Sequence, residues 1–179
     1  MAKFTPLLAL FLLFGCRSSG ALPGATPLRS VDDFELERYL GLWYEIAKYP
    51  VSFEDGLVGV TAEYSLREDG DVRVQNGGFE GSFDGEASEA TAKAWVPDSE
   101  RPAELKVQFF WPFSAKYWVV ALDPEYQWAI VGEPARKYLW ILSRTPQLDE
   151  ETYDALLVRI REELGYDTER LELMPQQAE

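Results

Sequence analysis

Eight short segments of alternating apolar and polar residues, separated by turn residues, dominate the chain from about residue 40 onward. Alternation with a period of two is typical of half-buried β-strands, and a regular series of such strands predicts an all-β sandwich or barrel. Hydrophobic residues make up 46% of the 179 residues, which is enough to enclose a sizeable core. The predicted strands span residues 42–49, 58–67, 72–79, 87–96, 104–111, 115–122, 127–132 and 138–144.

The connections between these strands alternate in character. Asp69-Gly70, the loop 97–102 and the turn 123–125 are polar and carry residues typical of tight turns. In an up-and-down barrel these three connections share one end, and the alternate connections share the other. An aromatic rim at that other end would form the mouth of a ligand cavity or a surface that meets lipid; alternatively, its side chains fold back and plug the barrel. The aromatic residues of this rim are Phe53, Phe79, Phe83, Trp111, Phe113 and Tyr138.

The period changes to that of a helix after the last predicted strand. Asp149 is placed to cap a helix, and Gly165 is placed to end it. We expect this helix to pack on the outside of the barrel through one apolar face, and residues 169–174 to add a short strand or bind a sheet edge. The apolar face consists of Tyr153, Leu156, Leu157, Ile160 and Leu164.

The composition excludes several kinds of chemistry. The chain has no histidine and one cysteine, so it cannot by itself assemble a His-dependent triad, a His metal site or a disulfide. A net charge of −14 repels phosphate backbones, which excludes nucleic acid as a partner. We therefore predict no metal and no cofactor, and a binding protein in preference to an enzyme.

The first sixteen residues have the layout of an export signal. Lys3 precedes an uncharged apolar run, residues 4–14, that is too short to span a bilayer and that leads to Gly15-Cys16. We predict a signal peptide at residues 1–15, and a lipidated N-terminus with a flexible tether, rich in Ser, Gly, Ala and Pro, at residues 16–30. Residues 31–179 then form the barrel domain. The alternative is an ordinary signal peptide that happens to precede Cys16.

Three short motifs resemble those of a known family. Gly41-Leu42-Trp43 at the start of the first strand, Asp123 in the turn after the sixth strand and Arg144 at the end of the last strand are similar to the motifs of bacterial lipocalins of the apolipoprotein D-like branch. The resemblance covers residues 31–174. It implies an eight-stranded antiparallel up-and-down β-barrel with an external C-terminal α-helix, and an outer-membrane lipoprotein of a Gram-negative bacterium.

The same motifs predict how the barrel closes. Arg144 shares one face of the last strand with Tyr138, Trp140 and Leu142, and points inward at the end with the polar loops. Trp43 reaches this end from the first strand, so the guanidinium is expected to stack on its indole. We assign a structural, barrel-closing role to Gly41, Trp43, Asp123 and Arg144.

The interior is expected to hold one elongated hydrophobic ligand, a fatty acid or a lysophospholipid, because the inward positions are apolar or aromatic with small alanines among them. Alternation also places Ile130 and Ala121 inside. The predicted ligand-binding residues are Phe53, Val60, Ala62, Tyr64, Ala92, Val107, Phe109, Trp111, Phe113, Tyr117, Val119, Trp128, Tyr138 and Trp140.

The sequence is also compatible with other functions. The barrel could be packed solid by its own aromatic side chains, or the aromatic rim could dock a partner in the envelope. An inward Glu45 with a raised pKa could serve an enzyme that acts on a bound lipid. The sequence also leaves open whether the chain forms a homodimer.

Overall fold

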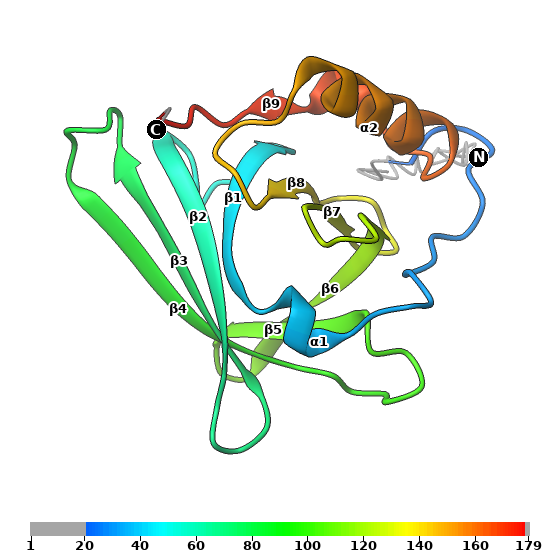
Figure 1. Cartoon of the computed structure of the whole chain (residues 1–179), viewed down its shortest axis with the longest axis horizontal. Coiled ribbons are helices and arrows are strands. Elements are labelled where there is room, and N and C mark those ends of the chain that lie inside the picture. Colours follow the sequence, from blue (N-terminus) through cyan, green and yellow to red (C-terminus); the bar gives the residue numbers. More distant parts are fainter. Residues whose placement is uncertain (1–20, 178–179) are drawn as a thin grey trace, which may run out of the picture.

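The structure, a computed structural model, describes residues 21–177 and contains one closed antiparallel barrel (Figure 1). Neighbouring strands pair in chain order from β2 to β8, and β1 pairs with both β2 and β8, which closes the cylinder. The predicted eight-stranded up-and-down barrel is confirmed. The strands are β1 (Gly41–Lys48), β2 (Leu57–Leu66), β3 (Val72–Glu80), β4 (Ala87–Trp95), β5 (Glu104–Phe110), β6 (Phe113–Leu122), β7 (Trp128–Gly132) and β8 (Leu139–Ser143).

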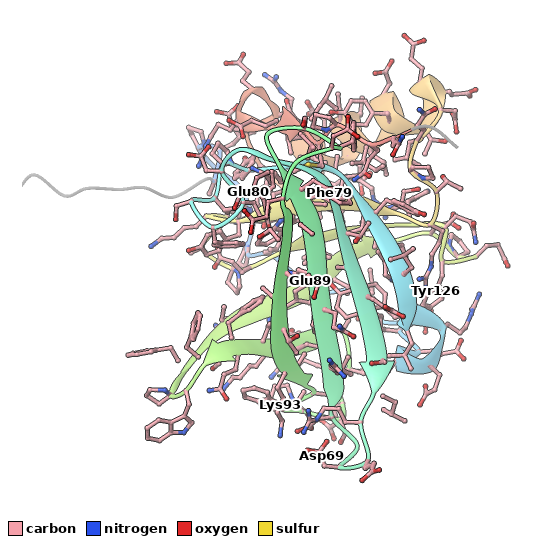
Figure 2. All side chains as sticks on the ribbon, turned by 90° about the vertical axis from the view of Figure 1, so that its left-hand side faces the viewer. Asp69, Phe79, Glu80, Glu89, Lys93 and Tyr126 are labelled. Carbon is pink, nitrogen blue, oxygen red and sulfur yellow. The ribbon has the colours of Figure 1, made fainter. Side chains whose placement is uncertain are left out.

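The two ends of the barrel differ as the connections predict. A short helix, α1 (Leu36–Tyr39), and the polar turns lie at one end, here called the floor. The β1–β2, β3–β4, β5–β6 and β7–β8 connections lie at the other end, here called the mouth. In Figure 2, Asp69 and Lys93 mark the floor end of β3 and β4, and Phe79 marks the mouth end.

Apolar side chains form two clusters on opposite sides of the barrel wall. The inner cluster contains Trp43, Tyr64 and Val119, and the outer cluster contains Ile141 together with Leu156 and Ile160 of α2. Helix α2 (Glu150–Glu162) begins where Asp149 accepts a hydrogen bond from the backbone N–H of Thr152 at 2.8 Å. The predicted external helix is thus confirmed (Figure 1). Neither α1 nor α2 is long and apolar enough to cross a membrane.

The predicted orientation of β7 is wrong. Ala129 and Val131 face the interior, whereas Trp128 and Ile130 lie in the outer cluster beneath α2. Both faces of this strand are covered, so its sequence has no polar face to reveal which side is inward. Ala121 also lies in the outer cluster, because a bulge between Val119 and Ala121 reverses the alternation along β6.

The described part of the predicted tether, residues 21–30, is packed against the barrel. Leu22 donates a backbone hydrogen bond to Gly165 at 2.9 Å, the Arg136 guanidinium donates to the Thr26 carbonyl at 2.6 Å, and Leu28 is buried. Residues 21–30 therefore have partners on other elements, which composition does not reveal. The predicted signal peptide and Cys16 lie outside the described residues.

The C-terminal segment fills a gap in the wall between β1 and β2. These two strands pair only as far as Tyr44 and Thr61, and β9 (Glu172–Leu173) then pairs with Ala47 and Lys48 of β1. Beyond β9, the Gln176 side chain donates to the carbonyls of Glu45 and Val60, each at 2.8 Å. The predicted C-terminal strand is confirmed, and it completes the side of the barrel.

Candidate ligand-binding site

The floor is closed by Arg144. Its guanidinium lies 3.8 Å from the centre of the Trp43 indole ring and donates to the carbonyls of Leu42 at 2.7 Å and of Arg38 and Leu40 at 2.9 Å each. The predicted stacking of Arg144 on Trp43 is confirmed. These carbonyls belong to the end of α1 and the start of β1, so a single side chain binds the last strand to the first.

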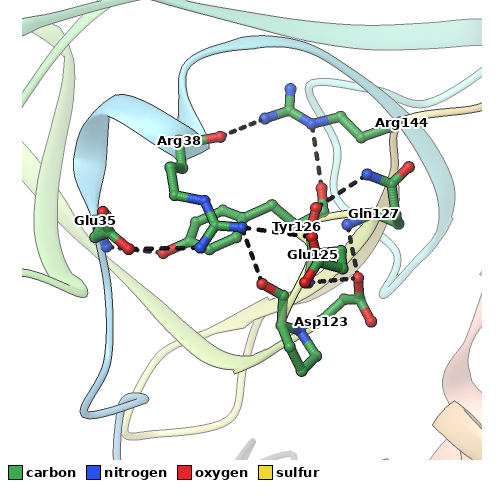
Figure 3. A network of polar contacts seen from close by, with 8 residues as sticks. Glu35, Arg38, Asp123, Glu125, Tyr126, Gln127 and Arg144 are labelled. Atoms are coloured by element: carbon green, nitrogen blue, oxygen red, sulfur yellow. Dashed lines mark hydrogen bonds and ion pairs between the residues drawn. The ribbon is translucent and has the colours of Figure 1, made fainter.

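The β6–β7 turn supports this closure from below (Figure 3). The Asp123 carboxylate accepts hydrogen bonds from the backbone N–H groups of Glu125 and Gln127 at 3.0 and 3.1 Å, which fixes the turn. Tyr126 then presents its hydroxyl to the Glu35 backbone N–H at 2.8 Å, and its ring lies beneath the Arg38 guanidinium at 4.1 Å. Asp123 therefore stabilises the floor indirectly, by orienting Tyr126.

Three tyrosines separate the floor from the space above it. The Tyr117 hydroxyl lies 2.7 Å from that of Tyr39 and 2.7 Å from that of Tyr64, so the three hydroxyl groups form one chain. Burial raises the pKa of all three phenols, which keeps them neutral. The rings of Tyr64 and Tyr117 line the cavity, while their hydroxyl groups hydrogen-bond to one another.

A cavity with two connected chambers extends from these tyrosines to the mouth. The inner chamber has a volume of about 190 Å³ and ends at Tyr64 and Tyr117, and the outer chamber has a volume of about 620 Å³ and includes Phe110 and Phe113. The two chambers share part of their walls, so they form one elongated space. The shared lining residues are Phe53, Glu54, Val60, Asn76, Val107, Phe109, Ala115 and Tyr138.

The outer chamber lies beside the shortest ladder among the eight barrel strands, between β4 and β5. Strands β3 and β4 pair at eight positions, whereas β4 and β5 pair at three, between residues 93–95 and 106–108. Ser88 and Ala90 of β4 and Phe109 of β5 line the chamber above this short ladder. The outer chamber therefore sits between two strands that diverge toward the mouth.

Most of the predicted ligand-binding residues line this cavity, and four do not. Ala92 and Val119 are buried in the inner cluster, Trp111 is 86% exposed, and Trp128 lies under α2. The ten that line one or both chambers are Phe53, Val60, Ala62, Tyr64, Val107, Phe109, Phe113, Tyr117, Tyr138 and Trp140.

Two carboxyl groups lie in the wall of the inner chamber. Glu45 and Glu54 are 4% and 7% exposed, and they neighbour each other. Burial and the adjacent Glu54 raise the pKa of Glu45 well above its usual range, against the opposing charge of Lys48. Burial also raises the pKa of Glu54, although Lys48 and the Trp140 indole oppose the shift. The pair therefore retains a proton at a pH where isolated carboxyl groups have lost theirs.

The sequence analysis missed Glu54 and Asn76 as cavity residues. Glu54 lies in the β1–β2 connection, where no period indicates which side chains turn inward. Asn76 was accessible to sequence reasoning, because it shares the parity of the buried residues Val72 and Val74 on β3. The predicted inward position of Glu45 on β1 is confirmed by its place in the chamber wall.

The mouth carries an exposed aromatic hairpin between β5 and β6. Phe110, Trp111 and Phe113 are 80%, 86% and 79% exposed, respectively. Phe53 is also exposed, at 61%, whereas the rings of Phe79 and Phe83 lie against Gly59. The aromatic rim is therefore divided into a packed part and an exposed part.

An eight-stranded up-and-down barrel with an arginine-closed floor and an apolar cavity defines a class of protein, and the chain belongs to that class, the lipocalin family. Residues 34–176 match the family model described as a lipocalin-like domain. The chain is 42% identical over 171 residues to a Vibrio cholerae protein named outer membrane lipoprotein Blc, covering 94% of this chain and 99% of that protein. It is 40% identical over 154 residues to bovine apolipoprotein D, covering 80% and 79% of the two chains.

A solved structure shows the same fold at lower identity. Insecticyanin from the tobacco hornworm Manduca sexta matches with a TM-score of 0.67 at 22% identity, and the match covers 86% of each chain. The match to the family model and the bacterial and bovine relatives confirm the resemblance to bacterial lipocalins of the apolipoprotein D-like branch.

Proposed function

We propose that the protein binds, stores or transports a small elongated hydrophobic ligand, a fatty acid or a lysophospholipid, in the two-chamber cavity. The observation that carries this proposal is the shape and lining of the cavity, which runs from the Tyr64 and Tyr117 rings to the mouth between mostly apolar walls. Each methylene group buried there contributes about 0.8 kcal/mol, so a chain of about ten carbons supplies useful affinity after the entropic cost of binding.

We also propose that Cys16 is lipidated and anchors the barrel to the outer membrane. The named bacterial relative supports this location. Ala21 bridges to Tyr166, whose hydroxyl donates to the Glu133 carbonyl at the mouth end of β7. Ala21 lies five positions after Cys16, a reach of at most about 18 Å. The anchor would therefore hold the mouth close to the membrane surface.

Ligand binding is tested with an acyl chain and a cavity-filling variant. Ala62 lines the inner chamber, so Ala62→Phe is expected to reduce the affinity for a fluorescent fatty acid at least tenfold. The control is Thr91→Phe, which adds the same ring at an exposed position of β4 and should leave binding unchanged. If saturable binding is absent from the wild-type protein, the proposal is refuted.

The exposed hairpin supports a second candidate function, docking of the mouth onto a partner or a lipid surface. Trp111 separates the two functions because it is exposed yet lines neither chamber. Trp111→Ser should preserve fatty-acid affinity if the cavity is the functional site, and should abolish vesicle or partner association if docking is the function. Mass spectrometry of recovered lipid also tests an enzymatic role of Glu45, since a carrier returns its ligand unchanged.

A further inference from the structure

Three buried oxygens in the cavity wall lack a fixed protein donor. Apart from the proton that Glu45 and Glu54 share, Glu45 Oε1, Glu54 Oε2 and Asn76 Oδ1 have no hydrogen-bond partner among residues 21–177. All three residues line the inner chamber, and Glu54 and Asn76 also line the outer one. Buried polar groups without partners are costly, so this wall is suited to a ligand that supplies donors.

The charged groups around the pair do not satisfy these acceptors. Lys48 is the cation whose field acts on both carboxyl groups, but its ammonium group bonds to Glu172 at 3.4 Å. Lys116 also lines the chamber, and its ammonium group lies 5.6 Å from the Trp118 ring. Lys48 is thus the neighbouring cation of three acids, Glu45, Glu54 and Glu172. The cavity wall therefore carries an excess of negative charge when Glu45 and Glu54 ionise.

We propose that Glu45 and Glu54 form a subsite for the primary ammonium group of a single-chain amphiphile whose hydrocarbon chain occupies the rest of the cavity. An ammonium group carries three N–H donors and a positive charge, so it can take the place of the proton that the two carboxyl groups otherwise share. Asn76 supplies a further acceptor from β3 on the same wall. This inference rests on the proposed function, because the chain contributes the apolar part of the affinity.

The opposite charge is disfavoured at this position. A free fatty-acid carboxylate beside Glu45 and Glu54 would add a third acceptor with no donor, and like charges in a desolvated site repel strongly. A neutral hydroxyl supplies one donor and no charge, so the affinity for an alcohol should lie between the affinities for the amine and the carboxylate. The subsite therefore ranks ligands of equal chain length in the order amine, alcohol, carboxylate.

The test compares dodecylamine, dodecan-1-ol and dodecanoate on the full chain by isothermal titration calorimetry at pH 7 and 0.15 M salt. We expect dodecylamine to bind at least tenfold more tightly than dodecanoate. Glu54→Gln, which keeps the size of the side chain, should weaken dodecylamine at least fivefold and change the affinity for the alcohol less than twofold. Glu45→Gln should act in the same direction.

The negative surface of the protein could attract any amine, and a matched variant controls for this. Glu63→Gln removes one carboxylate from an exposed position of β2 and should leave all three affinities unchanged. Melting temperatures establish that each variant is folded. If all three chains bind equally well, or if the preference for the amine survives in both glutamine variants, the subsite is refuted while the proposed function stands. If none of the three chains binds, the proposed function fails as well.

Discussion

Replacing Arg144 with alanine tests whether the floor is held by one side chain. The substitution removes three short hydrogen bonds to the carbonyls of Arg38, Leu40 and Leu42, and the stacking on Trp43. Arg144 is half-buried, so water replaces part of what is lost, and each hydrogen bond is counted at about 1 kcal/mol rather than at the full value for a charged donor. Stacking adds about 1 kcal/mol, for a total loss of about 3–4 kcal/mol.

A loss of this size is a substantial part of the stability of one domain. It corresponds to a decrease of about 10 °C in the melting temperature for a chain of this length, measured by circular dichroism. Arg144→Lys retains a charge but lacks the planar fork of N–H donors and the flat surface that stacks on Trp43, so it should recover less than half of the loss. The affinity for an acyl chain should change little at temperatures where the variant is folded, because Arg144 lines neither chamber.

Arg101→Ala is the matched control. Arg101 also lies at the floor end, but its partners Asp98 and Glu104 form surface ion pairs. Its removal should leave the melting temperature within about 2 °C of the wild-type value. If Arg144→Ala were no more destabilising than Arg101→Ala, the reasoning that one guanidinium fastens the last strand to the first would be wrong.

Two other perturbations have clear expected outcomes. Glu45→Gln should gain stability relative to the wild-type protein as the pH rises above about 4.5, because the wild-type protein loses folding stability between the ordinary pKa of a glutamate and the raised pKa of Glu45, by up to about 1.4 kcal/mol per pH unit. Urea unfolding at several pH values measures this difference, and a constant difference would contradict the raised pKa. Gln176→Ala removes two hydrogen bonds between β1 and β2 and should lower stability by about 2 kcal/mol, whereas Gln177→Ala, at the exposed neighbouring position, should have no effect.

Elements with one solvated face were predictable from the sequence. Alternation locates the strands, and the polar and aromatic connections distinguish the floor from the mouth. The errors fall where both faces of an element are covered or where the alternation shifts. Alternation places Trp128 in the interior, because β7 has no polar face that would reveal its orientation. It also places Ala121 in the interior, because nothing in the sequence marks the bulge in β6.

The acidic pair shows a different limit of sequence reasoning. Glu45 could be placed inside by its parity with Trp43, but its partner Glu54 lies in a connection nine residues further on, where neither period nor composition indicates direction. Their contact depends on how the β1–β2 connection folds back over the cavity. Pairing of this kind is a tertiary property, which the pattern of the sequence does not determine.

The floor and the cavity are held by separate sets of interactions. Arg144 binds carbonyls at the start of the barrel and the ring of Trp43, and none of these groups lines either chamber. The chain of Tyr39, Tyr117 and Tyr64 hydroxyls forms the boundary between the two regions. Substitutions above this boundary therefore change which ligand fits without loosening the closure of the barrel. The buried pair Glu45 and Glu54 lowers the stability of the fold, and the interactions of the floor offset this loss. The pair can therefore be maintained in the cavity wall.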